Sequence, residues 1–113
     1  MSVGFVIVLR PSVLANPDTD LRIVVPDSIE AVSGGAVAAE GWGYAPNGDM
    51  HLFFSSQSEA SGFAGIQQAL SHSLHKGNDL STATIACRVS QSGPYTVVAP
   101  IAAAGEVVED IDA

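Results

Sequence analysis

The stretch EGWGYAPNGDMHLFF, residues 40–54, predicts a β-hairpin and holds the only Trp of the chain. Runs of alternating small and large residues flank Asn47-Gly48, and Asn-Gly between two such runs is typical of a two-residue type I′ turn. With that loop, Ala45 pairs with Met50 and Trp42 pairs with Phe53. One face of the hairpin then carries Glu40, Trp42, Tyr44, His51 and Phe53, and the other carries Gly41, Gly43, Ala45, Met50, Leu52 and Phe54.

A long helix is expected to follow the hairpin and to pack on its glycine-containing face. Ser56 and Glu59 have the spacing of a capping box, which predicts that the helix begins at Ser56. The sequence predicts that Gly62 and Gly65 allow a close approach to the sheet, and that Gly77 supplies the left-handed residue after the helix. The expected apolar stripe recurs at helical spacing and consists of Phe63, Ile66, Leu70 and Leu74.

Four further segments have the composition of strands. Residues 3–9 are apolar on both alternating faces, as in a central strand, and residues 21–25 form a second strand that stops at Pro26. Residues 82–89 and 95–101 also alternate. The predicted order is β-β-β-β-α-β-β, an α+β fold with one antiparallel sheet of about six strands and one long helix on one face. Residues 1–101 are expected to form a single domain, and residues 102–113 a mobile acidic C-terminal tail, with docking of Val107, Val108 and Ile111 as the alternative.

The charge balance restricts the class of partner. Four Lys and Arg face twelve Asp and Glu, for a net charge of −8 in 113 residues. Nucleic-acid binding requires clustered basic residues, which this chain lacks, whereas an acidic surface attracts basic proteins. No apolar run reaches the roughly 18 to 20 residues of a membrane span. The single Cys87 excludes an internal disulfide and, with no signal-peptide pattern at the start, predicts a cytoplasmic protein.

No constellation of residues predicts catalysis, a metal or a cofactor. His72 and His75 share the expected polar side of the helix, but two further donors for a metal site are missing. Glu40 and His51 share the aromatic face without being cross-strand neighbours, because Glu40 should oppose Ser55. The glycine-rich segments lack the Lys of a phosphate-binding loop.

The aromatic face needs a cover. Leaving a large apolar side chain in water forfeits roughly 1.5 to 3 kcal/mol. Trp42, Tyr44 and Phe53 are therefore expected to be covered in one of three ways. Their own sheet curls over them, a second copy covers them in a homodimer, or a partner protein docks on them, since Trp and Tyr anchor many interfaces.

The leading hypothesis is a non-enzymatic, acidic protein-binding module that docks and inhibits a basic partner, as a toxin-neutralising immunity protein does. One alternative is a small-ligand-binding or enzymatic half-barrel with a pocket lined by Trp42, Tyr44, His51 and Phe53. Another is a structural homo-oligomer joined through the aromatic face. The predicted partner-binding residues are Asp18, Asp20, Asp27, Glu30, Glu40, Trp42, Tyr44, Asp49, His51 and Phe53.

Overall fold

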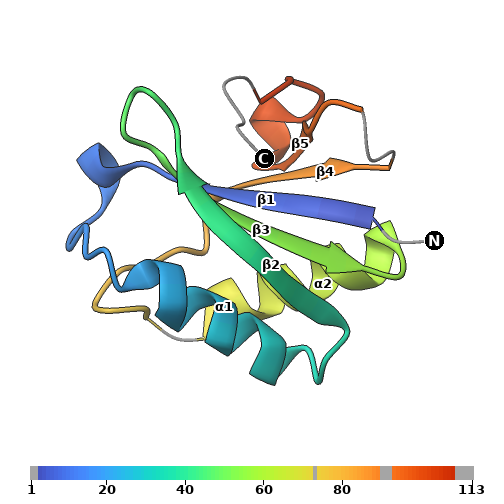
Figure 1. Cartoon of the computed structure of the whole chain (residues 1–113), viewed down its shortest axis with the longest axis horizontal. Coiled ribbons are helices and arrows are strands. Elements are labelled where there is room, and N and C mark those ends of the chain that lie inside the picture. The colour runs from blue at the N-terminus through green and yellow to red at the C-terminus, as the bar shows by residue number, and fades with distance from the viewer. Residues whose placement is uncertain (1–2, 73, 90–92, 109–113) are drawn as a thin grey trace.

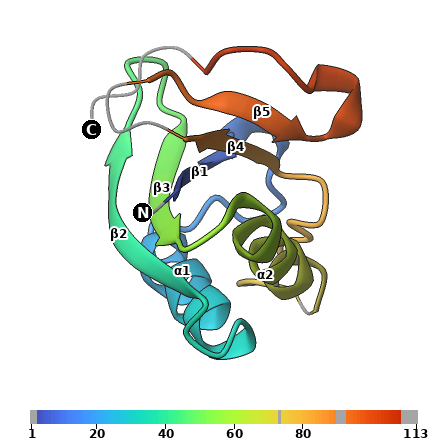
Figure 2. The same ribbon diagram turned by 90° about the vertical axis from the view of Figure 1, so that its right-hand side faces the viewer.

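The computed structural model describes residues 3–72, 74–89 and 93–108, which form one antiparallel sheet with two helices on the same face (Figures 1 and 2). The spatial order of the five strands is β2-β3-β1-β4-β5. The α+β class and the antiparallel sheet are confirmed, but the six strands and single helix are replaced by five strands and two α-helices. The elements are β1 (Val3–Leu9), η1 (Pro11–Val13), α1 (Leu21–Val32), β2 (Val37–Tyr44), β3 (Met50–Ser56), α2 (Glu59–His72), β4 (Thr84–Arg88), β5 (Thr96–Ala99) and η2 (Ile101–Ala103).

The strand predicted at residues 21–25 is wrong, because this segment is the first half of α1. Leu21, Val25 and Ile29 are buried, at the i, i+4, i+8 spacing of one helical face. Pro26 lies inside the helix and leaves the carbonyl of Arg22 without its usual backbone donor. Packing of the buried face on the sheet and on α2 outweighs this loss and the weak helix preference of Val and Ile.

The central strand β1 is buried on both faces, as its sequence predicts. Phe5, Ile7 and Leu9 belong to the main core with residues of α1, α2, β3 and β4. Val6 faces the other way, into a smaller cluster with Ala86, Tyr95 and Val97. The sheet therefore has a thick core under the helices and a thinner one on its reverse face.

Helix α2 packs closely on the sheet at Gly62, which confirms the role predicted for this glycine. A Cβ atom on Gly62 would lie 2.4 Å from Cε2 of Phe5. Gly65 instead makes room for the end of α1, since its Cβ would lie 3.0 Å from Cβ of Ser33. Both glycines are buried, and each marks a place where a neighbouring element approaches α2.

The predicted start and end of this helix need correction. Ser56 is the last residue of β3, and its hydroxyl donates to the Ala36 carbonyl at 2.9 Å. Ser58 caps the helix instead, because its Oγ accepts the Ser61 N–H at 3.2 Å. At the other end α2 stops at His72, so Leu74 lies outside the helix and is 64% exposed.

The hairpin loop has three residues rather than two. Ala45 donates its N–H to the Asp49 carbonyl and accepts the Gly48 N–H, both at 2.9 Å. Gly48 has a φ of +92°, whereas Asn47 is not among the positive-φ residues, so the type I′ turn is wrong. The arrangement is a turn with Pro46 in its first central position, followed by a left-handed glycine. As a result Tyr44, not Ala45, pairs with Met50.

Part of the predicted C-terminal tail folds back along β5. Val97 donates its N–H to the Glu106 carbonyl at 2.8 Å, and Val108 donates to the Tyr95 carbonyl at 2.9 Å. Val108 also packs against the smaller core cluster. The domain boundary predicted at residue 101 thus falls within η2 and separates β5 from residues 106–108, which bond to it. The rest of the predicted tail, with Glu109, Asp110 and Asp112, lies outside the described residues.

None of the helices in the described residues combines the length and the apolar character that a membrane crossing requires.

Candidate interaction surface

The hairpin register divides the predicted aromatic face between the two sides of the sheet. Trp42 pairs with Leu52 and Tyr44 with Met50, so both aromatic rings lie on the side that carries the helices. His51 and Phe53 lie on the reverse side. A one-residue change of register moves every side chain of a strand to the opposite face, which is why the common face predicted for these residues is wrong.

The ligand pocket predicted for Trp42, Tyr44, His51 and Phe53 is therefore not assembled. Trp42 and Tyr44 do remain together. Their rings meet edge to face, with centroids 5.6 Å apart and an interplanar angle of 78°. They are 50% and 45% exposed, so the described residues leave about half of each side chain uncovered.

Helix α1 borders the two rings along a seam with β2. The Arg22 guanidinium lies over the Trp42 ring, with its Cζ 4.9 Å from the ring centroid. At the other end of the seam, the Glu30 carboxylate accepts the N–H of Ala39 at 3.1 Å. Helix and strand thus run side by side in opposite directions.

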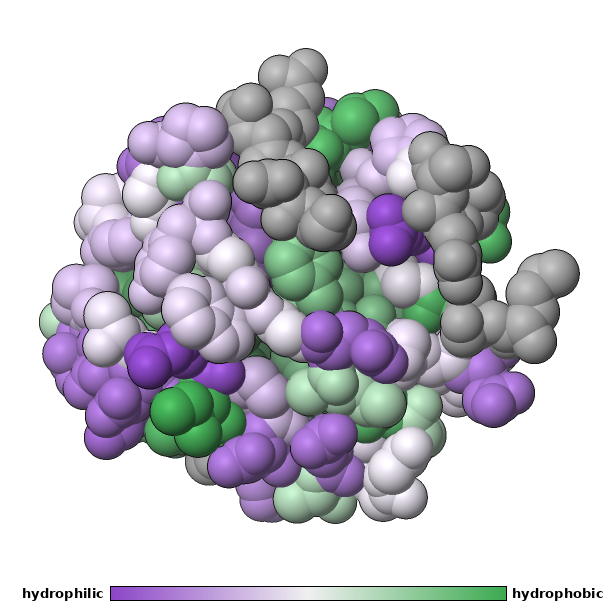
Figure 3. Space-filling model, viewed as in Figure 1, coloured by the Kyte–Doolittle hydropathy of each residue, from purple (hydrophilic) through white to green (hydrophobic). Residues whose placement is uncertain are grey.

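Ile23 extends the apolar part of this seam. It precedes Pro26 by three residues and Glu30 by seven, which places all three on one stripe of the helix, and it is 51% exposed. Asp27 follows it by one turn and is exposed. We define the α1–β2 surface by its residues, which are Arg22, Ile23, Pro26, Asp27, Glu30, Trp42 and Tyr44. The face in Figure 3 includes α1 and β2, and a strongly hydrophobic side chain stands among hydrophilic ones over α1.

The predicted acidic residues do not gather in one place. Asp27 and Glu30 belong to the α1–β2 surface, and Asp18 and Asp20 lie just before the first turn of α1. The Asp18 carboxylate accepts the N–H of Asp20 at 2.8 Å. Glu40 lies at the irregularity of β2 and accepts the Ser55 hydroxyl at 2.5 Å. Asp49 is mostly buried, and its carboxylate lies 3.6 Å from Nε of Arg10 at the base of the hairpin.

Each of the four basic side chains has an acidic or aromatic neighbour. Arg10 pairs with Asp49, and Nζ of Lys76 lies 3.8 Å from Asp20. The other two are arginines over aromatic rings, namely Arg22 over Trp42 and Arg88 over Tyr95. Among the described residues, the remaining carboxylates form no ion pair with a Lys or Arg, and most of them are exposed, so negative potential extends outside the molecule.

On the reverse face the chain covers its own aromatic side chains. His51 is buried, and its ring centroid lies 6.3 Å from that of Phe53. Phe53 in turn lies 6.1 Å from the Tyr95 ring of the smaller core cluster. Burial raises the pKa of the Tyr95 phenol, and the nearby Arg88 partly opposes this shift. Of the predicted docking residues, His51 and Phe53 thus take part in internal packing.

Sequence reasoning missed a polar cluster that ties the 74–80 segment to the first loop and to α1. His75, expected on an exposed helix side, is only 2% exposed, and its Nε2 lies 3.1 Å from the Ser28 hydroxyl. Asn78 accepts the N–H of Asn16 and donates to its carbonyl, both at 2.7 Å. Between them, Lys76 and Gly77 both have positive φ, as a type I′ turn requires, so Gly77 serves a turn rather than a helix end.

The reactive side chains Cys87 and His75 are both buried. Cys87 is buried, and burial together with Glu59 raises its thiol pKa to about 11, so the nucleophilic thiolate is scarce near neutral pH. Burial lowers the pKa of His75. Among the described residues, no three His, Cys, Asp or Glu side chains come together as a metal site requires.

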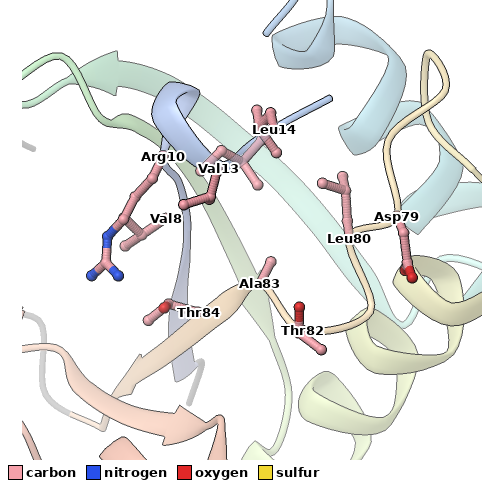
Figure 4. Close-up of a pocket in the computed structure, with 10 residues that line it drawn as sticks. Val8, Arg10, Val13, Leu14, Asp79, Leu80, Thr82, Ala83 and Thr84 are labelled. Atoms are coloured by element: carbon pink, nitrogen blue, oxygen red, sulfur yellow. The ribbon is translucent and has the colours of Figure 1, made fainter. Parts of the chain in front are cut away.

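One pocket lies at the end of the sheet, between η1 and the segment leading into β4 (Figure 4). Its volume is about 170 Å³. Ligand pockets usually measure about 300 to 1,000 Å³, so this one is small. Figure 4 shows the Arg10 guanidinium pointing away from Leu80 and Asp79 at the far side. The lining residues are Val8, Leu9, Arg10, Val13, Leu14, Asp79, Leu80, Thr82, Ala83 and Thr84.

No protein-family model, no curated protein and no solved structure matches this chain.

Proposed function

We propose that this chain is a non-enzymatic, acidic protein-binding module that docks a basic partner protein on its α1–β2 surface and thereby inhibits it, as toxin-neutralising immunity proteins do. The observation that carries the proposal is the pair of half-exposed rings of Trp42 and Tyr44, on a surface that also includes the exposed carboxylates of Asp27 and Glu30. Large aromatic side chains of this kind anchor protein interfaces when a partner desolvates them.

The charge distribution supports a basic partner. The net charge is −8, and the few cations are already engaged by neighbours within the fold. Such a field speeds the encounter with a positively charged protein and slows the encounter with another acidic one. A homodimer through the same surface would bring two molecules of like charge together, so the basic partner is the better match. Inhibition requires no catalytic group, because the docked chain need only cover the basic site of its partner.

A salt series tests the electrostatic part of the proposal. The partner is captured from the native host with the immobilised chain, identified and purified. We expect its association rate with the chain to fall steeply between about 0.05 M and about 0.5 M salt, because a Debye length that shrinks from above 10 Å to below 5 Å screens charge steering. The partner's own activity, measured with and without the chain, tests inhibition directly.

Variants test the location of the docking site. Trp42→Ala and Tyr44→Ala should each weaken binding by tenfold or more, as roughly 2 kcal/mol per anchoring residue implies. Ile101→Ala is the matched control, because Ile101 is exposed but lies on η2, away from the α1–β2 surface. The proposal would be contradicted if Trp42→Ala and Tyr44→Ala both bind the partner with full affinity and the association rate does not change with salt concentration.

A further inference from the structure

We infer that the partner docks with an extended basic segment that adds as a strand to the free edge of β2 at Trp42 and Tyr44. β2 is the outermost strand of the sheet on this side, and among the described residues no strand pairs with its outer edge (Figure 2). An open edge of this kind offers backbone N–H and C=O groups to another chain. The inference rests on the proposed function for the basic character of the partner.

The hydrogen-bond pattern shows which residues of β2 face outward. In an antiparallel pair, residues alternate between those bonded to the neighbouring strand and those whose backbone groups point away from it. Ala45 bonds inward to Asp49, and by alternation Gly43 also points toward β3. The backbone N–H and C=O groups of Trp42 and Tyr44 therefore point off the sheet. The two residues with half-exposed rings are thus the two with an open backbone edge.

The rest of the edge is closed to pairing. Ala39 also points outward, but the Glu30 carboxylate already accepts its N–H at 3.1 Å. The pairing register shifts between Ala39 and Gly41, and Gly41 has a φ of +134°, which interrupts the strand. On the other side the hairpin loop begins after Tyr44. The open edge is therefore short and spans residues 42–44, which fits a brief extended segment rather than a whole sheet.

Charge selects the occupant of this edge. A strand added beside β2 directs every second side chain toward the helix side of the sheet, where the Trp42 ring lies. Lys or Arg at those positions would be attracted by the net charge of −8, and the position of Arg22 over Trp42 shows that this ring accepts a guanidinium. A second copy of the chain, pairing through the same edge, would bring its own net charge of −8. The fitting occupant is an extended segment with alternating basic residues.

Amide hydrogen exchange gives the direct readout with the unaltered chain. The probe is a capped hexapeptide of alternating arginine and valine at low salt. We expect exchange of the Trp42 and Tyr44 amides to slow by about tenfold or more when the peptide is bound, because outward N–H groups become hydrogen-bonded. The Gly43 amide, which points toward β3, is the internal reference and should change little. A peptide of the same sequence with every backbone nitrogen methylated keeps the charge, but its methyl groups block the close approach of its backbone to β2, so it should not protect these amides.

A pair of substitutions separates the backbone from the side chain. Tyr44→Ala and Tyr44→Pro both remove the ring, but only the proline removes the outward N–H, and an edge position tolerates it. We expect Tyr44→Pro to bind the peptide at least about fivefold more weakly than Tyr44→Ala, the value of one lost hydrogen bond. Thermal unfolding of both variants checks that the fold is retained.

The outcomes distinguish this inference from the proposed function. Equal binding of the methylated and unmethylated peptides, with unchanged exchange at Trp42 and Tyr44, overturns strand addition but leaves charge-driven docking intact. No binding of the hexapeptide at low salt also overturns it. If Trp42→Ala and Tyr44→Ala in addition leave binding of the captured partner unaffected, and its association rate does not depend on salt, the proposed function is contradicted as well.

Discussion

Substitution of Gly62 by Ala tests the packing of α2 against the sheet. Gly62 lies within the helix, where Ala is favoured over Gly by about 1 kcal/mol, so secondary-structure propensity alone predicts stabilisation. The structure predicts the opposite. The new Cβ would lie 2.4 Å from Cε2 and 2.8 Å from Cζ of Phe5, and 2.8 Å from Cβ of Ser56. Carbon atoms in contact normally lie about 3.5 to 4.0 Å apart, so the overlap exceeds about 1 Å.

The ring of Phe5 has nowhere to move, because it is fully buried in the main core. Forcing a methyl group into a well-packed core typically costs about 1 to 3 kcal/mol, and two rigid neighbours place this site at the upper end or beyond. After the gain in helix propensity, we expect Gly62→Ala to lower the free energy of unfolding by about 2 kcal/mol. Urea unfolding followed by far-UV circular dichroism measures this difference.

Two further variants give this measurement its control. Gly65→Ala should cost less, because the nearest atoms to its new Cβ, on the side chains of Ser33 and Val37, lie at 3.0 and 3.1 Å rather than 2.4 Å. Phe5→Leu removes the ring, so the double variant Phe5→Leu/Gly62→Ala should be more stable than the sum of the single changes predicts. A Gly62→Ala protein as stable as the wild type would refute the close approach of α2 to β1.

Three other predictions follow from the buried polar groups. Burial lowers the pKa of His75 in the folded state, so as pH falls the unfolded chain takes up the proton first. The contribution of His75 to the free energy of unfolding is therefore fully present above its ordinary pKa of 6.5, and it is lost as pH falls from 6.5 toward the folded pKa. Titration of wild type against His75→Gln isolates this contribution, and identical pH profiles would count against it. Asn78→Ala should destabilise the fold by about 1 to 3 kcal/mol, because Asn16 loses its buried partner, and thermal or urea unfolding measures the loss. Cys87 should react with a thiol reagent at neutral pH only as fast as the protein opens, since its pKa is raised to about 11; rapid labelling of the native protein would show that it is accessible.

The positions of the predicted docking residues restrict the candidate docking site to the α1–β2 surface. His51 and Phe53 pack inside, Asp49 is engaged by Arg10, and Glu40 is bonded to Ser55. Two groups of predicted docking residues remain exposed on the α1–β2 surface, namely the rings of Trp42 and Tyr44 and the carboxylates of α1. Variants outside the α1–β2 surface therefore serve as controls for binding experiments.

Local patterns in the sequence were sufficient to predict an element where its apolar residues follow a single clear spacing. The double-sided apolar run of β1 identifies a central strand, and Asn-Gly between alternating runs identifies the hairpin. The two glycines within the predicted helix, Gly62 and Gly65, indicate a close approach to the sheet, which the contacts of Gly62 confirm. The net charge of −8 is likewise a property of the sequence alone.

Tertiary structure decided the conformation of segments whose local sequence is compatible with two alternatives. The segment LRIVV at residues 21–25 is short enough for strand or helix, and only burial of Ile29 beyond Pro26 makes the helical spacing continuous. The APNGD loop accommodates a turn of two or three residues, and the choice reverses the faces of the strand that follows. Strand pairing and helix packing supply energies larger than these local preferences. The sequence therefore determined that β1, the hairpin and α2 form, while the packed fold decided that residues 21–32 are a helix and where Trp42 points.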